Sequence, residues 1–403
     1  MTSVTVRRPA APVRATVQLP RSKSVSNRAL IMASLIGDLD LVKELSDGDD
    51  TRVMYELLRD QPHTMDCGAG GTTLRFLLAW AAVQEGEEHL ITGIPRLMER
   101  PHDDLVLALK TLGADIERTS KGFLVKGCKM KGGAVHFDSP ISSQYLSALV
   151  LIAPKLEQGL DLKWTGTRLS EPFVRMTLKM LDHFGVRASL TMDGAQVPPG
   201  AYQAVPYIVP PDWSSAAFWF QQVALDPGAE VVLPGLTMDT LQGDREAVRL
   251  WSPWVVAEDT EEGMHLTHST DPVEGARDPV DLKHVPDLFQ PLAFTVAGRG
   301  EMAAFTGLDN LVVKETDRLK AVAEALAAFG CTAGHRGGTF IQGGTIVNKG
   351  AHTFDPNIDH RMALSLAPMS LMVESVTIKD PAVVNKSYPN YWKDLREAGY
   401  SVE

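Results

Sequence analysis

The chain has 403 residues, of which 44% are hydrophobic, and it carries 39 lysines and arginines against 50 aspartates and glutamates. A net charge of −11 argues against a general binder of nucleic acid or of anionic membranes, because both need an excess of basic residues. The hydrophobic share is typical of a globular protein rather than a disordered one, and the length predicts two or more domains.

The placing of the cysteines and the lengths of the apolar runs indicate the cellular compartment of the protein. Cys67, Cys128 and Cys331 lie far apart and form no C-x-x-C pair, which excludes a disulfide scaffold or a cysteine-rich zinc module. No apolar segment follows the arginines near the N-terminus, as it would in a signal peptide. No run approaches the roughly 18 apolar residues of a membrane-spanning helix. We therefore expect a cytoplasmic protein without a membrane segment.

Along the chain, one pattern of elements recurs at a nearly constant interval. An amphipathic helix ends at a glycine and runs into a short hairpin with a glycine turn. The helix-ending glycines are 72 and then 145 residues apart (Gly113, Gly185, Gly330), and the turn glycines are spaced by 72, 69 and 75 (Gly122, Gly194, Gly263, Gly338). Glycine is expected at both places because each favours a positive φ.

A second series of helices shares this interval. Its starts lie near Ser24, Thr72, Ser142, Ser214, Asp287 and His360, at intervals of 48, 70, 72, 73 and 73 residues. Five of these six residues are Ser, Thr or Asp, which can cap the free N–H groups of a helix. Two helices and about four strands per interval predict an α/β fold in which a βαβαββ unit occurs six times, three in each of two domains.

The first helix starts gather side chains that suit anions. A helix N-terminus offers free N–H groups and partial positive charge. Ser24 and Arg28 share one face of their helix, and Lys23 stands just before them. Ser142 and Ser143 place two hydroxyl groups together, followed by the Gln144 amide. An ordinary capped surface helix would explain any one of these starts taken singly.

The remaining motifs lie in the second half of the chain. In VKETDR, Lys314 and Arg318 are one turn apart with Glu315 between them, a pattern that a salt-bridged helix start also explains. The glycine-rich turn before Thr72 has neither nucleotide-binding fingerprint, and the chain contains no H-E-x-x-H, no G-x-S-x-G and no metal-spaced His/Cys cluster. These absences favour chemistry without metal or cofactor.

SKSVSNRAL, GTTLR, PRLMERP, SSQ, VKETDR and DHRM occur in one order, and from Leu19 to about Trp392 the chain resembles the 5-enolpyruvylshikimate-3-phosphate synthases, a family of enolpyruvyl transferases. The resemblance implies two domains of three βαβαββ units, residues 1–20 with 212–403 and residues 21–211, with the ligands bound between them. It implies transfer of the enolpyruvyl group of phosphoenolpyruvate to the 5-hydroxyl of 3-phosphoshikimate, in aromatic amino acid and chorismate biosynthesis. It also implies a monomer that binds only small anions and is inhibited by glyphosate.

The resemblance assigns roles residue by residue. The catalytic set is Asp287, which takes the 5-hydroxyl proton, Glu315, which protonates and deprotonates the methylene carbon, and Lys23 and Lys314. The 3-phosphoshikimate set is Lys23, Ser24, Arg28, Ser142, Ser143, Gln144, Ser170, Asp287, Asn310 and Lys314. The phosphoenolpyruvate set is Lys23, Gly71, Arg100, Gln144, Arg318, His360, Arg361 and Lys386.

Several positions depart from the family pattern. Phe76 and Phe173 stand where Pro and Tyr are common, and Ala69 replaces a usual Asn. None of these touches the acid–base pair, so we expect retained activity. Three alternatives stay open: an enolpyruvyl transferase acting on UDP-N-acetylglucosamine, a non-catalytic sugar-phosphate-binding remnant, and an ATP-dependent phosphate cyclase. The first usually brings a Lys-Asn pair near its start, where this chain has Lys23-Ser24.

Overall fold

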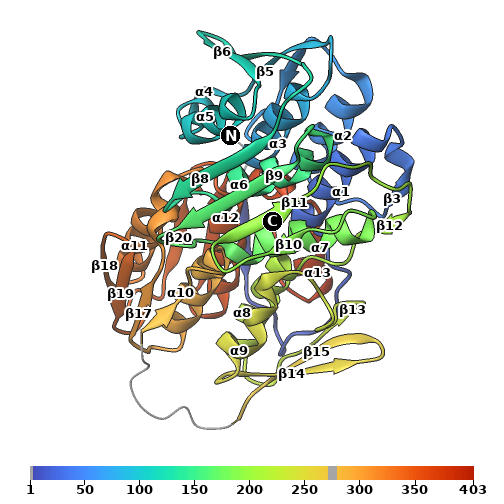
Figure 1. Cartoon of the computed structure of the whole chain (residues 1–403). Coiled ribbons are helices and arrows are strands. Elements are labelled where there is room, and N and C mark those ends of the chain that lie inside the picture. The colour runs from blue at the N-terminus through green and yellow to red at the C-terminus, as the bar shows by residue number, and fades with distance from the viewer. Residues whose placement is uncertain (1–2, 271–278) are drawn as a thin grey trace. The chain divides into compact units, whose positions relative to one another are not determined.

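The computed structural model describes residues 3–270 and 279–403, and the chain divides into two compact units (Figure 1). Unit 1 comprises Met1–Arg21 and Pro210–Glu403, and unit 2 comprises Ser22–Val209. Each unit has a hydrophobic core of its own. The domain boundaries implied by the resemblance stay a prediction, because a compact unit need not fold alone.

The described residues form five four-stranded sheets, and all five share one topology. In each, the first two strands pair in parallel and the other pairs are antiparallel, so that the spatial order of the strands is 1-2-4-3. A helix follows each of the first two strands. The expected βαβαββ repeat is therefore confirmed. A sixth sheet contains only the parallel pair β3 (Val42–Lys43) and β12 (Tyr207–Ile208), so one repeat is reduced.

Three of these sheets belong to unit 1. Their strands are β2 (Arg14–Thr16), β13 (Glu230–Pro234), β14 (Val255–Thr260) and β15 (Gly263–His268); β16 (Val280–Asp281), β17 (Ala303–Thr306), β18 (Thr332–Arg336) and β19 (Thr339–Gly343); and β20 (Ala351–Phe354), β21 (Ser375–Lys379), β22 (Ser401–Val402) and β1 (Ser3–Arg7). In the last sheet the chain's first strand pairs between β21 and β22, so the N-terminal segment completes the final repeat.

The other two four-stranded sheets belong to unit 2. Their strands are β4 (Thr64–Asp66), β5 (Glu88–Thr92), β6 (Asp115–Thr119) and β7 (Gly122–Lys126); and β8 (Gly133–Asp138), β9 (Leu160–Thr165), β10 (Ser189–Leu190) and β11 (Gly194–Val197). Figure 1 shows β8, β9 and β11 side by side, as their pairing requires.

Helices that follow the first strand of a repeat are buried on all sides. They are α8 (Trp213–Leu225), α10 (Phe289–Gly298) and α12 (His360–Leu366) in unit 1, and α3 (Gly71–Ala82) and α6 (Ser143–Ile152) in unit 2, where α1 (Lys23–Ile36) packs with them. In α3, for example, every residue except Thr72 is buried. Helices that are apolar all round belong in a core, and their N-termini carry most of the predicted site residues.

The remaining helices have one exposed side. They are α2 (Asp49–Asp60), α4 (Pro95–Met98), α5 (Asp103–Thr111) and α7 (Glu171–His183) in unit 2, and α9 (Ala247–Trp251), α11 (Arg318–Ala328) and α13 (Tyr391–Glu397) in unit 1. No helix among the described residues is long and apolar enough to cross a membrane.

Two local expectations were wrong. Ser24 and Thr72 do not cap their helices, because α1 begins at Lys23 and α3 at Gly71, which puts both hydroxyl groups inside the first turn. Gly194 and Gly338 do not have positive φ, unlike the helix-ending Gly113, Gly185 and Gly330. Gly194 is required for a different reason: a Cβ there would collide with the Leu162 carbonyl of the neighbouring strand.

Candidate active site

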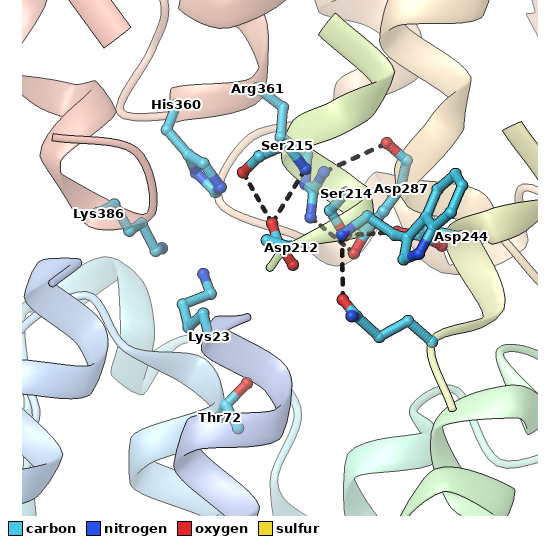
Figure 2. Close-up of polar contacts among 12 residues, drawn as sticks. Lys23, Thr72, Asp212, Ser214, Ser215, Asp244, Asp287, His360, Arg361 and Lys386 are labelled. Atoms are coloured by element: carbon cyan, nitrogen blue, oxygen red, sulfur yellow. Dashed lines mark hydrogen bonds and ion pairs between the residues drawn. The ribbon is translucent and has the colours of Figure 1, made fainter. Parts of the chain in front are cut away.

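In unit 1, Asp287 lies between the guanidinium groups of Arg318 and Arg361. Figure 2 shows its pairing with Arg361. Asp287 occupies the short 3₁₀ turn Pro286–Leu288 before α10. Arg318, the first residue of α11, places Nη1 3.0 Å from its Oδ1, and Arg361 of α12 places Nη2 2.9 Å from its Oδ2. Both oxygens of the carboxylate are thereby engaged by arginine.

Arg318 binds two further carboxylates. Its Nε lies 2.7 Å from Oδ2 of Asp359 and its Nη2 lies 3.3 Å from Oε2 of Glu315. Burial alone would lower the pKa of the Arg318 guanidinium, but the three carboxylates around it outweigh burial and raise the pKa. The group therefore stays charged, as a buried arginine must if it is to bind an anion.

Asp359 is a site residue that the sequence analysis missed. Its Oδ1 accepts a hydrogen bond from the Arg361 backbone N–H at 2.9 Å and caps α12, while its Oδ2 holds Arg318. The side chain is fully buried. Its position directly before His360 and Arg361 in DHRM was the available signal.

Glu315 also pairs with Lys386, which comes 71 residues later in the chain. Nζ of Lys386 lies 2.7 Å from Oε1 of Glu315, and both side chains are largely buried. Lys386 ends the 3₁₀ turn Pro381–Lys386. Lys314 follows the turn Asp309–Val313, which contains the buried Asn310. The second predicted catalytic carboxylate thus also lies between two cations.

In unit 2, Arg28 is a buried cation with hydroxyl and carbonyl partners. Its Nε donates to Oγ1 of Thr177 at 2.7 Å, and its Nη2 donates to Oγ of Ser147 at 3.1 Å. Among the residues that the structure describes, no carboxylate pairs with it, and burial lowers its pKa to about 9. Arg28 therefore remains charged at neutral pH with its charge uncompensated, which favours binding of an anion.

The two aromatic departures from the family pattern both contact Arg28. The guanidinium carbon lies 5.3 Å from the ring centre of Phe76 and 5.8 Å from that of Phe173. Such contacts stabilise a cation without neutralising it. The sequence alone indicated only what these residues lack, not that they share one partner.

Lys23 is the first residue of α1, and Arg100, which follows α4, places its guanidinium beside the first residue of α3. Nζ of Lys23 lies 3.0 Å from Oδ2 of Asp50, in the first turn of α2. Gly71 opens α3, where a Cβ would lie 2.6 Å from Nη1 of Arg100. A side chain at this position would therefore displace the guanidinium of Arg100.

Three hydroxyl groups and one amide complete the unit 2 set. Oγ of Ser142 accepts from the Gln144 N–H and caps α6, whose first residue is Ser143. The Gln144 side chain donates to Oγ1 of Thr72 at 2.8 Å and accepts from Arg75. Ser170 precedes α7 with φ of 56°, a left-handed conformation that is strained outside glycine and that recurs at functional sites.

The predicted site residues thus fall into two sets, one in each unit. Unit 1 holds Asp287, Asn310, Lys314, Glu315, Arg318, His360, Arg361 and Lys386, and unit 2 holds Lys23, Ser24, Arg28, Gly71, Arg100, Ser142, Ser143, Gln144 and Ser170. Within residues 3–270 and 279–403, no group of three or more His, Cys, Asp or Glu residues is arranged to hold a metal ion.

Two solved structures with the same fold are an EPSP synthase and an enolpyruvyl transferase. An EPSP synthase from Acinetobacter baumannii matches with a TM-score of 0.76 and 22% identity, covering 100% of both chains. The enolpyruvyl transferase NikO from Streptomyces tendae matches with a TM-score of 0.73 and 13% identity, covering 100% of this chain and 98% of its own. The fold is therefore the two-domain enolpyruvyl transferase fold.

Sequence relatives define the family within that fold. The family model for EPSP synthase (3-phosphoshikimate 1-carboxyvinyltransferase) matches residues 7–62 and 60–395. A 3-phosphoshikimate 1-carboxyvinyltransferase from Bacteroides fragilis is 38% identical over 399 residues, covering 97% of each chain, and one from Aliivibrio fischeri is 31% identical, covering 98% of this chain and 99% of its own. This chain belongs to the EPSP synthase family.

Proposed function

We propose that the chain transfers the enolpyruvyl group of phosphoenolpyruvate to the 5-hydroxyl of 3-phosphoshikimate and releases phosphate. Family membership makes it a transferase of the shikimate pathway. One structural observation carries the mechanism: a single guanidinium, that of Arg318, pairs with both Asp287 and Glu315. The two carboxylates that the reaction needs are thus held in one arrangement with the cations that an anionic substrate needs.

The chemistry proceeds by addition and elimination. Glu315 protonates C3 of phosphoenolpyruvate, so C2 gains cationic character, while Asp287 takes the proton of the attacking 5-hydroxyl. The product is a tetrahedral ketal phosphate. Loss of a C3 proton to Glu315 and departure of phosphate then give the enol ether.

The cations of the site stabilise the negative charges of the substrate and of the departing phosphate in this reaction. Arg318, Arg361 and Lys386 in unit 1, and Lys23 and Arg100 in unit 2, would bind the carboxylate and phosphate of phosphoenolpyruvate. A guanidinium can engage both oxygens of a carboxylate at once, which suits arginine to this task. Donors fixed in advance lower the barrier for phosphate departure because they need no reorganisation.

For 3-phosphoshikimate, Arg28 would bind the carboxylate, and the hydroxyl groups of Ser142, Ser143 and Ser170 would bind the phosphate. Lys314 and the amides of Gln144 and Asn310 would complete this set, and Ser24 would contribute from the first turn of α1. The uncompensated charge of Arg28 supports this assignment.

A phosphate-release assay tests the proposed function. We expect release only when phosphoenolpyruvate and 3-phosphoshikimate are both present, and none when UDP-N-acetylglucosamine replaces 3-phosphoshikimate. Release with the UDP-sugar would favour the alternative acceptor, and no release with either would favour a non-catalytic binding protein. Glyphosate should inhibit, and an inhibition constant in the millimolar range would count against that expectation.

We further propose that the protein works as a monomer in the cytoplasm. The scattered cysteines support a reducing compartment. Sedimentation of the full chain at micromolar concentration should give the mass of one copy, and a dimer mass would overturn the proposal.

A further inference from the structure

Asp244 is a buried carboxyl group that the predicted site did not include. It lies in the 3₁₀ turn Gly243–Glu246, and its side chain is almost fully buried. Oδ2 accepts a hydrogen bond from the hydroxyl of Ser214, in the first turn of α8. Oδ1 is buried and has no hydrogen-bond partner in the described part of the chain. Burying an ionised carboxylate in such a position is costly, so this geometry favours the neutral acid.

The charges around Asp244 belong to the candidate active site. Figure 2 shows Asp244 and Ser214 beside Asp287, near Arg361. Burial first, and then the negative charge of Asp287 with a smaller effect of Asp212, raise the pKa of Asp244 to about 7, although Arg361 and Ser214 act to lower it. On its own turn, Arg245 donates to the Met238 carbonyl and Glu246 pairs with Arg249. Asp244 is thus placed to change charge near neutral pH.

We propose that Asp244 is a positioning residue for the transfer reaction: its neutral form leaves Arg361 to phosphoenolpyruvate, and its ionised form competes for Arg361 and weakens phosphoenolpyruvate binding. The inference rests on the proposed function, because it takes Arg361 as a phosphoenolpyruvate ligand. It adds to Asp287, Glu315 and Asp359 a further carboxyl group, one that acts on a neighbouring arginine and transfers no proton to the substrate.

The sign of the pH dependence follows from the pKa. Below about pH 7 Asp244 is protonated and Arg361 has one carboxylate partner in this group, Asp287. As the pH rises above about 7, Asp244 ionises and the Michaelis constant for phosphoenolpyruvate should rise, while that for 3-phosphoshikimate changes much less.

The first test measures kcat and both Michaelis constants between about pH 6 and about pH 9 in Asp244→Asn. We expect the wild-type Michaelis constant for phosphoenolpyruvate to rise at least about fivefold between pH 7 and pH 8.5, and Asp244→Asn to remove that rise, since a neutral amide cannot ionise. Asp226→Asn is the matched control, because Asp226 is another carboxylate of unit 1 whose burial raises its pKa. It accepts from the Val13 N–H, away from this group. A rise that persists in Asp244→Asn overturns the proposal.

A second variant and a direct measurement keep the test independent of folding and of activity. Ser214→Ala removes only the hydrogen bond that favours the ionised form, so the rise should move to higher pH; an unchanged position contradicts the proposal. Without added substrates, the infrared carbonyl band of a protonated carboxyl should appear in wild type minus Asp244→Asn and vanish above about pH 7. No band at pH 6 overturns the proposal, whereas a band without any product formation would contradict the proposed function alone.

Discussion

Nη1 of Arg318 lies 3.0 Å from Oδ1 of Asp287, and the same guanidinium holds the fully buried carboxylate of Asp359. Replacing Arg318 by Gln would leave Asp359 buried without a counter-charge. We expect a loss of about 3–5 kcal/mol in the free energy of unfolding, measured by chemical denaturation. Lys320→Gln, an exposed cation on the same helix, should cost less than about 0.5 kcal/mol. Equal effects of the two changes would contradict a special role of Arg318.

Glu315→Gln should lower kcat with a smaller change in either Michaelis constant. The amide still accepts a hydrogen bond from Lys386 but cannot transfer a proton, so a loss of about 100- to 10,000-fold in kcat is expected. Steady-state phosphate release measures it. The control is Glu324→Gln on α11, because the Glu324 side chain is exposed. Wild-type turnover by Glu315→Gln would remove Glu315 from the mechanism.

Arg28→Met should separate stability from binding. A buried charge without a carboxylate partner costs free energy, but methionine also removes the hydrogen bonds to Thr177 and Ser147. These effects oppose each other, so the free energy of unfolding should change by less than about 2 kcal/mol in either direction. The Michaelis constant for 3-phosphoshikimate should rise at least about 100-fold, because a desolvated charge pair is lost. A strongly destabilised Arg28→Met variant with normal 3-phosphoshikimate binding would show that Arg28 serves stability and not binding.

Gly71→Ala should act through Arg100. The added methyl group would lie 2.6 Å from Nη1 of Arg100, so the guanidinium must move. We expect the Michaelis constant for phosphoenolpyruvate to rise about tenfold or more. In Gly200→Ala the methyl group meets nothing within 4 Å, and its kinetics should match wild type. Unchanged phosphoenolpyruvate kinetics in Gly71→Ala would count against Arg100 as a ligand.

His102 should make unit 2 sensitive to acid. Burial, aided by the charge of Arg75, lowers its pKa from 6.5 to about 4. The unfolded chain therefore takes up a proton first as the pH falls, and stability present above about pH 6.5 is lost between about pH 6.5 and about pH 4, by up to roughly 3 kcal/mol. Denaturation at several pH values should show a smaller loss in His102→Asn and the full loss in the exposed control His63→Asn. The same acid loss in both variants would exclude His102 as its source.

Sequence periodicity predicted the repeat and the approximate starts of one helix series because each repeat uses the same local signals, an apolar helix and a glycine stop. It could not predict pairs such as Lys386 with Glu315, which are 71 residues apart and meet only through tertiary packing. The sequence could not predict that the sixth sheet is reduced either, since a two-residue strand such as β3 is too short to show an alternation of polar and apolar residues.

The sequence analysis identified the site residues that lie in recognisable motifs. It missed residues that hold or influence the side chains of those motifs, such as Asp359 and Asp244. Their roles depend on burial and on a neighbouring charge, which the sequence does not display. The contacts of Phe76 and Phe173 with Arg28 were missed for the same reason.

The internal pairing of the unit 1 cations makes ligand binding an exchange reaction. Arg318, Arg361 and Lys386 each pair with a carboxylate of their own unit, so an incoming anion competes with Asp287 and Glu315 for them. The total number of ion pairs then changes little, and ionic strength should affect binding less than the number of cations suggests. Abundant simple anions such as sulfate gain little from such an exchange, and selectivity depends on whether the newcomer fits the arginine geometry better than the carboxylate that it replaces.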